Sequence, residues 1–238
     1  MLPVNPDLFK KIFPTNVSAF FSDTTADFTL PLGAAGLSGP QKDFLRNALS
    51  INPPKVYTMR QVHGNRVLVI GAKDIPQNSN IPEADAMVTN VPGIVLSVRT
   101  ADCLPVFLYD PYSKCIGLVH AGWKGSALKI VSETVKVLSR TFESDPKDIL
   151  AAFGPSIREC CYEVGEEFAK TFPGEVFQRK NTMCLNLPLV NRNQLLNSGV
   201  KDENIFESGE CTVCTKGFYS FRRDQEKAGR HLSLMTMV

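Results

Sequence analysis

The sequence contains little histidine. Of its 238 residues, only His63, His120 and His231 are histidines. An enzyme with a mononuclear copper site and a trinuclear copper cluster needs many more imidazole ligands, so a multicopper oxidase in the strict sense is excluded. A single copper site with two histidines and one cysteine remains compatible with the ligand types, with Met59 or Met87 as a distant axial ligand.

Long apolar runs and a strong excess of charge are also missing. No stretch reads as a membrane span, and residues 1–7 lack the basic region and apolar run of a secretory signal. The formal net charge of +2 is too small to indicate nucleic acid or an anionic membrane as a partner. The seven cysteines, an odd number, fit a reducing compartment better than a disulfide framework. We therefore expect a cytoplasmic protein that binds neither nucleic acid nor membrane.

Length and composition are those of a globular chain with a large core. Hydrophobic residues make up 43% and charged residues 21%, and no linker, repeat or low-complexity segment divides the chain. Apolar patterns predict strands at 17–22, 56–59, 67–70, 94–98, 106–109, 115–119, 149–153, 218–222 and 232–238, and helices at 41–49, 127–142, 166–172 and 187–197. We predict one α+β domain over residues 1–238, with mixed and antiparallel β-sheets packed together and helices on the outside.

The segment from Thr100 to Trp123 contains the clearest reactive pattern. Two apolar runs flank the turn residues Asp110-Pro111-Tyr112-Ser113, which predicts a β-hairpin. In an antiparallel pair folded about Tyr112, Cys103 lies almost opposite His120. The hairpin therefore brings a thiol and an imidazole together at the ends of two strands.

His63 is a third candidate at a strand-to-strand junction. Two imidazoles and one thiolate suit zinc with one position left open for water or substrate, and no fourth ligand is obvious. The helix that follows Gly125 points its N-terminal amides toward the same end of the hairpin, where an anion such as phosphate or carboxylate could be held.

The remaining cysteines favour a structural interpretation. Cys211 and Cys214 have the spacing of half a zinc knuckle. The other half would have to come from Cys160, Cys161 or Cys184, none of which repeats that spacing, so core or strand cysteines are favoured over a second zinc site. His231, in a terminal strand, is interpreted as structural.

Arg222 and Arg223 allow two interpretations. They are either a solvated strand end or, with the aromatic residues before them, one edge of a site for an anion or an aromatic substrate. The sequence leaves both open.

Short motifs occur along the chain from about residue 56 to the C-terminus. They are residues 61–64 (QVHG), 83–86 (EADA), 100–105 (TADCLP), 120–125 (HAGWKG), 154–157 (GPSI), 161–165 (CYEVG), 218–224 (FYSFRRD) and 229–230 (GR). In type and order they resemble the motifs of the laccase-domain family, also called the polyphenol oxidase, purine nucleoside phosphorylase or peptidoglycan editing factor family.

The resemblance implies a zinc ion held by His63, Cys103 and His120. It also implies phosphorolysis of adenosine, inosine, guanosine or methylthioadenosine, with some adenosine deamination. Asp102, Glu83 and Asp85 are carboxylates that could move protons or orient an imidazole, and we select Asp102 with Cys103 and His120 as catalytic.

Phosphorolysis needs cationic or amide groups around a phosphate. Lys124, Arg222 and Arg223 are the side chains predicted to bind it. Lys124 replaces the family's usual arginine, which keeps the charge but loses the bidentate fork.

Three alternatives follow from the same residues. Copper-linked oxidation of phenols is an older assignment for the family. A remoter likeness to toxin deamidases makes Cys103 a nucleophile and His120 its base, as in a peptidoglycan editing amidase. A protein that binds the metal without catalysis is the third. It is suggested by residues 22–27 and 30–33, where the family's usual arginine and asparagine are missing from a substrate loop.

Overall fold

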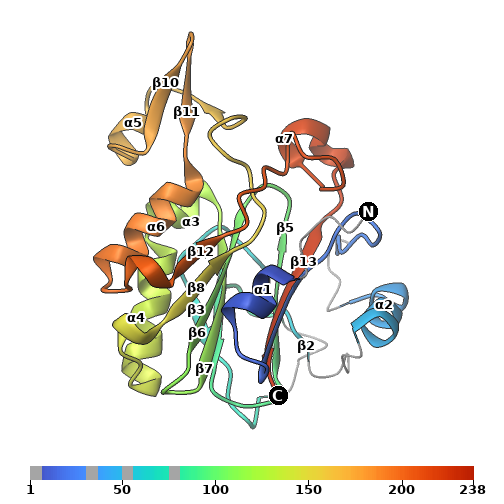
Figure 1. Ribbon diagram of the computed structural model, residues 1–238. Helices are drawn as coiled ribbons and strands as arrows, with labels where there is room; N and C mark the ends of the chain where they lie inside the picture. The colour runs from blue at the N-terminus through green and yellow to red at the C-terminus, as the bar shows by residue number, and fades with distance from the viewer. Residues whose placement is uncertain (1–6, 31–36, 50–55, 75–80) are drawn as a thin grey trace.

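Two β-sheets pack face to face, with helices on the outer face of each (Figure 1). The structure is a computed structural model that describes residues 7–30, 37–49, 56–74 and 81–238. In Figure 1, α3, α4 and α6 lie on the left of the sheets and α2 lies on the right. The predicted α+β class, with mixed and antiparallel sheets and outer helices, is confirmed.

The larger sheet has six strands in the order β12-β8-β6-β7-β4-β3. Its strands are β3 (Val67–Val69), β4 (Ala86–Thr89), β6 (Leu104–Asp110), β7 (Cys115–Ala121), β8 (Leu150–Phe153) and β12 (Ile205–Glu207). The outer pairs β12–β8 and β3–β4 are parallel, while the central pairs are antiparallel. All residues of β6 and β7 are buried, which explains why both read as continuous apolar runs.

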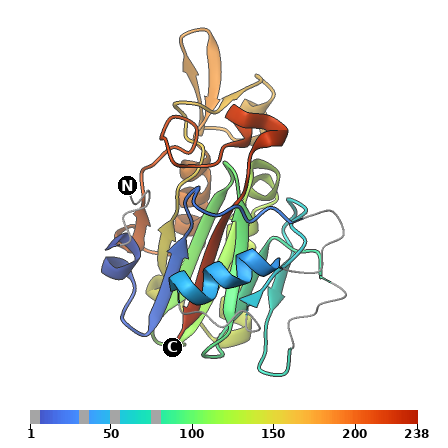
Figure 2. The ribbon, with the colours of Figure 1, turned by 90° about the vertical axis from the view of Figure 1, so that its right-hand side faces the viewer.

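The smaller sheet has four strands in the order β1-β13-β5-β2. Its strands are β1 (Val17–Phe21), β2 (Val56–Tyr57), β5 (Val95–Thr100) and β13 (His231–Met237). Figure 2 views the molecule from this side, where α2 (Gly39–Leu49) crosses in front of the sheet. The N-terminal helix α1 (Asp7–Ile12) contacts β1 and the edge of β8.

Strand alternation divides the apolar residues into separate layers. Val106 and Leu108 of β6 face the helices, whereas Phe107 and Tyr109 face the smaller sheet. In β13, Leu234 packs under the outer layer and Met235 packs between the sheets. The central hairpin is thus held from both faces, which fixes its register and the positions of its ends.

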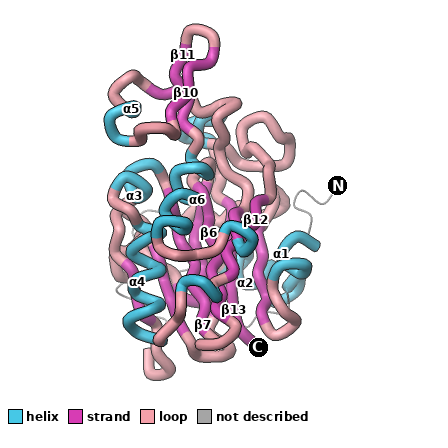
Figure 3. The backbone as a smooth tube through the Cα atoms, turned by 60° about the vertical axis from the view of Figure 1, so that its left-hand side comes forward, coloured by secondary structure: helices cyan, strands magenta, loops and turns pink. Residues whose placement is uncertain are grey.

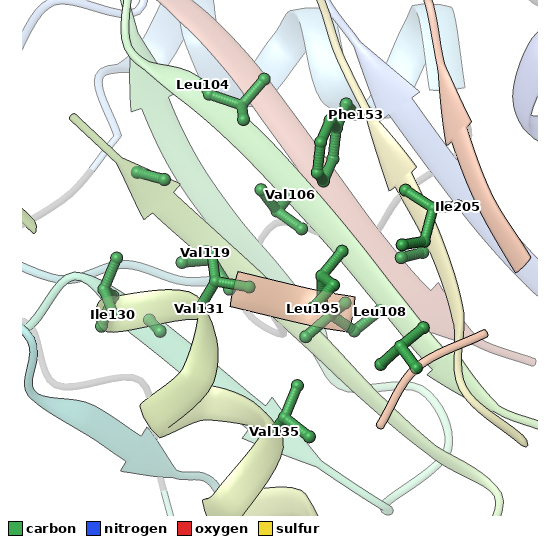
Figure 4. Close-up of a cluster of buried hydrophobic side chains, with 14 of the residues drawn as sticks. Leu104, Val106, Leu108, Val119, Ile130, Val131, Val135, Phe153, Leu195 and Ile205 are labelled. Carbon is green, nitrogen blue, oxygen red and sulfur yellow. The ribbon is translucent and has the colours of Figure 1, made fainter. Parts of the chain in front are cut away.

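The layer on the helical face is shown in Figure 4. Side chains of β6, β7, β8 and β12 meet Ile130, Val131 and Val135 of α4 (Ile130–Phe142) and Leu195 of α6 (Leu187–Asn197). The predicted helix 187–197 is confirmed with its boundaries, because Asn186 caps the first turn by accepting from Leu189 N–H at 2.9 Å. Among the described helices, none is long and apolar enough to cross a membrane.

A third small sheet projects from the end of the molecule that carries the reactive residues (Figure 3). Its strands are β9 (Glu163–Val164), β10 (Val176–Arg179) and β11 (Thr182–Leu185), with α5 (Phe168–Thr171) in the connection.

One predicted helix begins later than expected, and one predicted strand is wrong. The helix expected over 127–142 is α4, which begins at Ile130, and a separate helix, α3 (Trp123–Ala127), precedes it. The two are separated at Lys129, whose backbone is left-handed with φ 62°. The strand expected over 218–222 is replaced by the short helix α7 (Phe221–Asp224). Ser220 caps α7 by accepting from Arg223 N–H at 3.2 Å, so a capping signal outweighed the alternation of aromatic and polar residues. Residues 31–33, where the sequence departs from the family's usual substrate loop, lie outside the described residues.

Candidate metal centre and cavity

The three predicted metal ligands lie together at one end of the larger sheet. One ligand atom from each of His63, Cys103 and His120 lies within 4.8 Å of the others. In the hairpin register, His120 pairs with Pro105 and the first paired residue of β6 is Leu104, so Cys103 directly precedes the paired segment. The imidazole of His120 and the thiol of Cys103 therefore meet at the strand ends, as the sequence predicted.

Asp85 organises this group. Its Oδ1 lies 2.8 Å from His120 Nδ1 and accepts from His63 N–H at 2.9 Å. Its Oδ2 accepts from Gly64 N–H at 2.7 Å and from Val62 N–H at 3.2 Å. Because Nδ1 of His120 is bound to the carboxylate, Nε2 is the nitrogen left for a ligand. One fully buried side chain therefore holds both histidine-bearing segments in place.

Two of the site residues have left-handed backbones. His63 has φ 59° and Asp102 has φ 85°, conformations that residues other than glycine rarely adopt. In both cases hydrogen bonds to neighbouring segments hold the turn. His63 N–H donates to Asp85, and Asp102 accepts from Thr212 Oγ1 and Arg222 N–H. These two turns allow the imidazole of His63 and the thiol of Cys103, the residue after Asp102, to lie close to each other.

Gly122 leaves room for the side chains of Cys103 and His63. A Cβ at this position would lie 2.9 Å from Cys103 Sγ and 3.0 Å from His63 Cδ2. A Cβ at Gly125 would lie 2.9 Å from the carbonyl oxygen of Gly64, so the start of α3 packs directly on the loop that carries His63. The two glycines of the 120–125 motif thus have a steric reason to be there.

Electrostatics favour a thiolate at this centre. Burial alone would raise the pKa of Cys103, but His120 and His63 stabilise the thiolate and lower the pKa to about 6. Burial opposes the charge on His120, and the Cys103 thiolate and Asp85 reverse this effect and raise the pKa of His120 to about 9. The metal-free site thus favours a thiolate paired with an imidazolium.

The donor set fits zinc. An anionic sulfur and two imidazole nitrogens are ligands that zinc accepts, and three protein ligands leave the fourth position open. Asp85 supplies the hydrogen-bonded carboxylate that fixes the orientation and tautomer of a ligating histidine. The same three ligand types also accept copper.

The centre opens into a cavity of about 820 Å³. The lining groups are cationic, aromatic and polar, which is the mixture expected for a small, charged ligand with a flat ring. They include Thr29, Arg60, Gln61, Arg99, Trp123, Lys124, Ile157, Tyr162, Phe221, Arg222, Gln225 and Arg230.

Arg99 and Arg230 form a cationic pair in this cavity, which sequence reasoning missed. Burial, together with the nearby charge of Arg230, lowers the pKa of Arg99 to about 10. Nη1 of Arg99 is buried and has no hydrogen-bond partner among the described residues. Two guanidinium groups that repel each other next to a cavity are stabilised by an anion between them. The available signal in the sequence was Arg99, which directly follows the largely apolar segment 94–98.

Two of the three predicted phosphate-binding side chains line the cavity. Lys124 and Arg222 do so, and Arg222 also stacks on Tyr162, with its Cζ 5.3 Å from the ring centroid. Arg223 is not among the lining residues. Its guanidinium donates to the backbone carbonyls of Thr212, Val213 and Phe218 at 2.8–3.2 Å, so it supports the wall of the site.

The three candidate carboxylates have different surroundings. Both oxygens of Asp102 are engaged, by Thr212 Oγ1 and by Arg222 N–H, each at 2.6 Å. Glu83 is partly exposed and pairs with Arg60 at 2.6 Å. Asp85 alone contacts an imidazole of the centre, so the geometry favours a positioning role for Asp102 instead of proton transfer.

The structure overturns the interpretation of four cysteines as ordinary core residues. Cys160 and Cys214 are exposed, Cys161 is half-buried and Cys211 is buried. Their four sulfur atoms nevertheless all lie within 4.8 Å of one another. The pairing was missed because the partners of the 211–214 spacing are two adjacent cysteines and not a second spaced pair. His231, in contrast, is buried and accepts from Tyr219 N–H at 2.7 Å, as a structural residue does.

Comparisons with known proteins add to this geometry. A family model described as "Multi-copper polyphenol oxidoreductase laccase" matches residues 41–238. The chain is 36% identical over 191 residues to the purine nucleoside phosphorylase YlmD of Bacillus subtilis (strain 168), which covers 74% of this chain and 69% of that protein. It is 36% identical over 186 residues to adenosine deaminase RL5 of an unknown prokaryotic organism, covering 72% and 71%. The crystal structure of the hypothetical protein YfiH of Bacillus licheniformis, 27% identical, matches with a TM-score of 0.84 over 97% of this chain and 94% of that chain.

Proposed function

The chain belongs to the multi-copper polyphenol oxidoreductase laccase family, and we propose that within it this protein is a zinc-dependent purine nucleoside phosphorylase with an accompanying adenosine deaminase activity. The substrate class is that of the relatives named purine nucleoside phosphorylase and adenosine deaminase. The observation that carries the proposal is the position of the Arg99–Arg230 pair in the same cavity as the three metal ligands.

The proposed reaction joins a nucleoside and inorganic phosphate. A phosphate oxygen forms a bond to C1′ of the ribose as the bond between C1′ and the purine nitrogen breaks. The bonding electrons leave with the purine, which takes up the proton that hydrogen phosphate carries. The products are the free base and ribose 1-phosphate, so atoms and charge balance without a further reactant.

Cationic residues of the cavity hold the phosphate in this proposal. Arg99 has an unpaired buried N–H group, and Arg230 shares its electrostatic environment. Lys124 adds a third positive charge from the start of α3. Together they bind a doubly charged anion and reduce its repulsion from the developing negative charge on the purine.

Aromatic residues of the same cavity bind the base. Trp123, Tyr162 and Phe221 line it and offer flat apolar faces to a purine. The ring of Phe221 lies 5.8 Å from the guanidinium carbon of Arg230, so the base and phosphate subsites are adjacent. In this proposal the ribose lies between the two subsites.

The metal would be held by His63, Cys103 and His120. Zinc bound there supplies Lewis-acid chemistry and activates water, which is the chemistry that deamination requires. The chain's contribution is to keep Cys103 as a thiolate and, through Asp85, to keep Nε2 of His120 available. Copper is the competing metal, and the scarcity of histidine restricts it to one ion at this centre.

A second candidate function has its own supporting observation. The lowered pKa of Cys103 and the contact of His120 with Asp85 are also the features of a cysteine hydrolase, such as a peptidoglycan editing amidase. In that mechanism Cys103 is the nucleophile and His120 is the base. His63 then has no essential role, whereas in the zinc mechanism it is a ligand.

The two functions are separated by one set of variants. The zinc-loaded protein is assayed with adenosine, inosine, guanosine and methylthioadenosine, with and without phosphate, and compared with His63→Ala and Cys103→Ala. The proposal predicts that both substitutions abolish phosphate-dependent cleavage and lower the zinc content. If His63→Ala cleaved nucleosides at the wild-type rate with chelator present, the zinc-dependent mechanism would be ruled out, whereas nucleosides left intact and an amide cleaved by His63→Ala would favour the hydrolase.

A further inference from the structure

Four cysteines outside the proposed active site form a compact group of sulfur atoms. We call them the four-cysteine cluster, which consists of Cys160, Cys161, Cys211 and Cys214. All four sulfurs lie within 4.8 Å of one another, and Cys160 Sγ is 3.9 Å from Cys214 Sγ. A disulfide needs about 2.05 Å between sulfurs, so the thiols are neighbours but not bonded.

We propose that the four-cysteine cluster binds a second Zn²⁺ with a structural role. Four sulfurs at about 2.3 Å from a tetrahedral zinc lie roughly 3.8 Å from each other, close to the separation between Cys160 and Cys214. Complete thiolate coordination leaves no open position, which is typical of structural zinc. This proposal concerns residues that take no part in the phosphorylase mechanism and does not depend on it.

The separation of the sulfurs favours one metal ion over an iron–sulfur cluster. In a cluster with several irons, the cysteines bind different metal atoms and are spread around a larger core. Here all four sulfurs lie within 4.8 Å of one another, which is compact enough for a single ion. Sulfur-only coordination also disfavours magnesium and calcium, which require oxygen ligands.

The backbone around Cys211 is arranged for an anionic sulfur. Burial alone would raise its pKa, but backbone N–H groups of Cys214, Arg158 and Val213 hydrogen-bond to the sulfur and lower it. Thr215 N–H also donates to the carbonyl of Cys211 at 3.0 Å, which closes the turn between the two spaced cysteines. This turn places the sulfurs of Cys211 and Cys214 on the same side of the chain, facing the other two cysteines.

Without a cation, the thiols of Cys160 and Cys161 resist ionisation. Burial, with the nearby sulfurs, raises the pKa of Cys160, and burial raises that of Cys161 to about 11. A divalent cation reverses this effect, because each thiolate then has an opposite charge as its nearest neighbour. Zinc binding would therefore release protons from the cluster.

The cluster joins two connections that are distant in sequence. Ser156 and Cys211 form an isolated parallel bridge, with Thr212 N–H donating to Ser156 O at 3.1 Å. The two connections follow β8 and β12, which are themselves parallel neighbours in the larger sheet. A metal bound by cysteines from both connections would crosslink them and so add to the stability of this region.

The crosslinked connections form one wall of the active-site cavity. Thr212, inside the 211–214 turn, donates to Asp102, the residue before the ligand Cys103. Tyr162, directly after Cys161, lines the cavity. Arg223 donates to the carbonyls of Thr212 and Val213 and so supports the same turn. The second zinc would hold this wall in position without contacting substrate.

The proposal is tested by counting and characterising zinc in variants purified without chelator. Wild type should contain about two zinc ions per chain, and Cys103→Ala about one. In Cys103→Ala, X-ray absorption at the zinc edge should show four sulfurs at about 2.3 Å. The exposed pair Cys160→Ser/Cys214→Ser should lose one zinc and keep the other, whereas Cys184→Ala, outside both groups, should keep both.

Several results would overturn the proposal. These are Cys103→Ala protein free of zinc, a zinc shell dominated by nitrogen and oxygen, iron in place of zinc, or a disulfide between Cys160 and Cys214 in protein kept reduced. The absorption measurement uses only Cys103→Ala, so it stays decisive even if the double variant does not fold. Inactivity toward nucleosides would contradict the proposed function but leave this metal count unchanged.

Discussion

Asp85 Oδ1 lies 2.8 Å from Nδ1 of His120, and the same carboxylate accepts the backbone N–H groups of Val62, His63 and Gly64. The two histidines proposed to hold the metal come from different strand junctions. A single buried carboxylate is thus their common support, and its hydrogen bonds lower its own pKa despite burial, which acts in the opposite direction.

Asp85→Asn removes the charge that orients His120 while keeping the size of the side chain. We expect zinc affinity at the Cys103 centre to fall by about 10- to 100-fold, as is typical when the partner of a ligating histidine is lost. Competition with a chelator measures this. Glu83→Gln is the matched control, because Glu83 pairs only with Arg60 at the surface and should leave the affinity unchanged.

Arg99→Met tests the anion subsite. Loss of a charge-assisted hydrogen bond of roughly 1.5–3 kcal/mol should raise the KM for phosphate about 10- to 100-fold, with a smaller effect on the KM for nucleoside. Zinc content should stay the same. Arg140→Met, on the exposed face of α4, is the control. An unchanged KM for phosphate in Arg99→Met would remove this residue from the subsite.

Gly122→Ala tests the steric argument for the metal centre. The new methyl group would meet Cys103 Sγ at 2.9 Å and His63 Cδ2 at 3.0 Å, so the two ligands must separate. We expect zinc binding weakened at least tenfold and phosphorolysis reduced to a similar extent, measured by metal analysis and initial rates. Gly39→Ala adds a methyl that meets nothing within 4 Å and should behave as wild type.

The buried His231 should make the stability of the folded protein depend on pH. Burial lowers its pKa to about 4, below the value of 6.5 expected for the unfolded chain. The unfolded state therefore binds the extra proton first, and stability is lost as pH falls from 6.5 toward 4. The loss amounts to about 3 kcal/mol relative to His231→Asn, which does not titrate. Urea unfolding of both proteins in a Cys103→Ala background, with chelator present, measures it. Parallel curves for the two proteins between pH 7 and 4 would contradict the prediction.

The hairpin and the meeting of Cys103 with His120 were predictable because their signals are local. Turn residues at 110–113 fix the pairing of β6 with β7, and pairing fixes which strand ends meet. His63 was proposed as the third member from its place between two predicted strands, and the family resemblance implied the same residue. The helix at 187–197 was equally predictable, because its start and stop signals lie in the sequence at its own ends. These are the cap, the proline near the first turn and the glycine after the last turn.

The remaining parts of the site depend on long-range contacts. Arg99 and Arg230 are brought together by the pairing of β13 with β5, in which His231 faces Thr100. The four-cysteine cluster depends on the parallel bridge between Ser156 and Cys211. No periodicity or spacing records such contacts. The break between α3 and α4 was missed for a different reason, because Lys129 in a left-handed conformation leaves the apolar spacing intact.

Phosphate-dependent product formation tests the central claim most directly. Zinc-loaded protein is incubated with inosine and increasing phosphate, and hypoxanthine and ribose 1-phosphate are quantified together. The account predicts equal amounts of both products, a rate that saturates with phosphate, and loss of the reaction in His63→Ala. Inosine left intact at every phosphate concentration, or free ribose formed at a rate independent of phosphate, would contradict it.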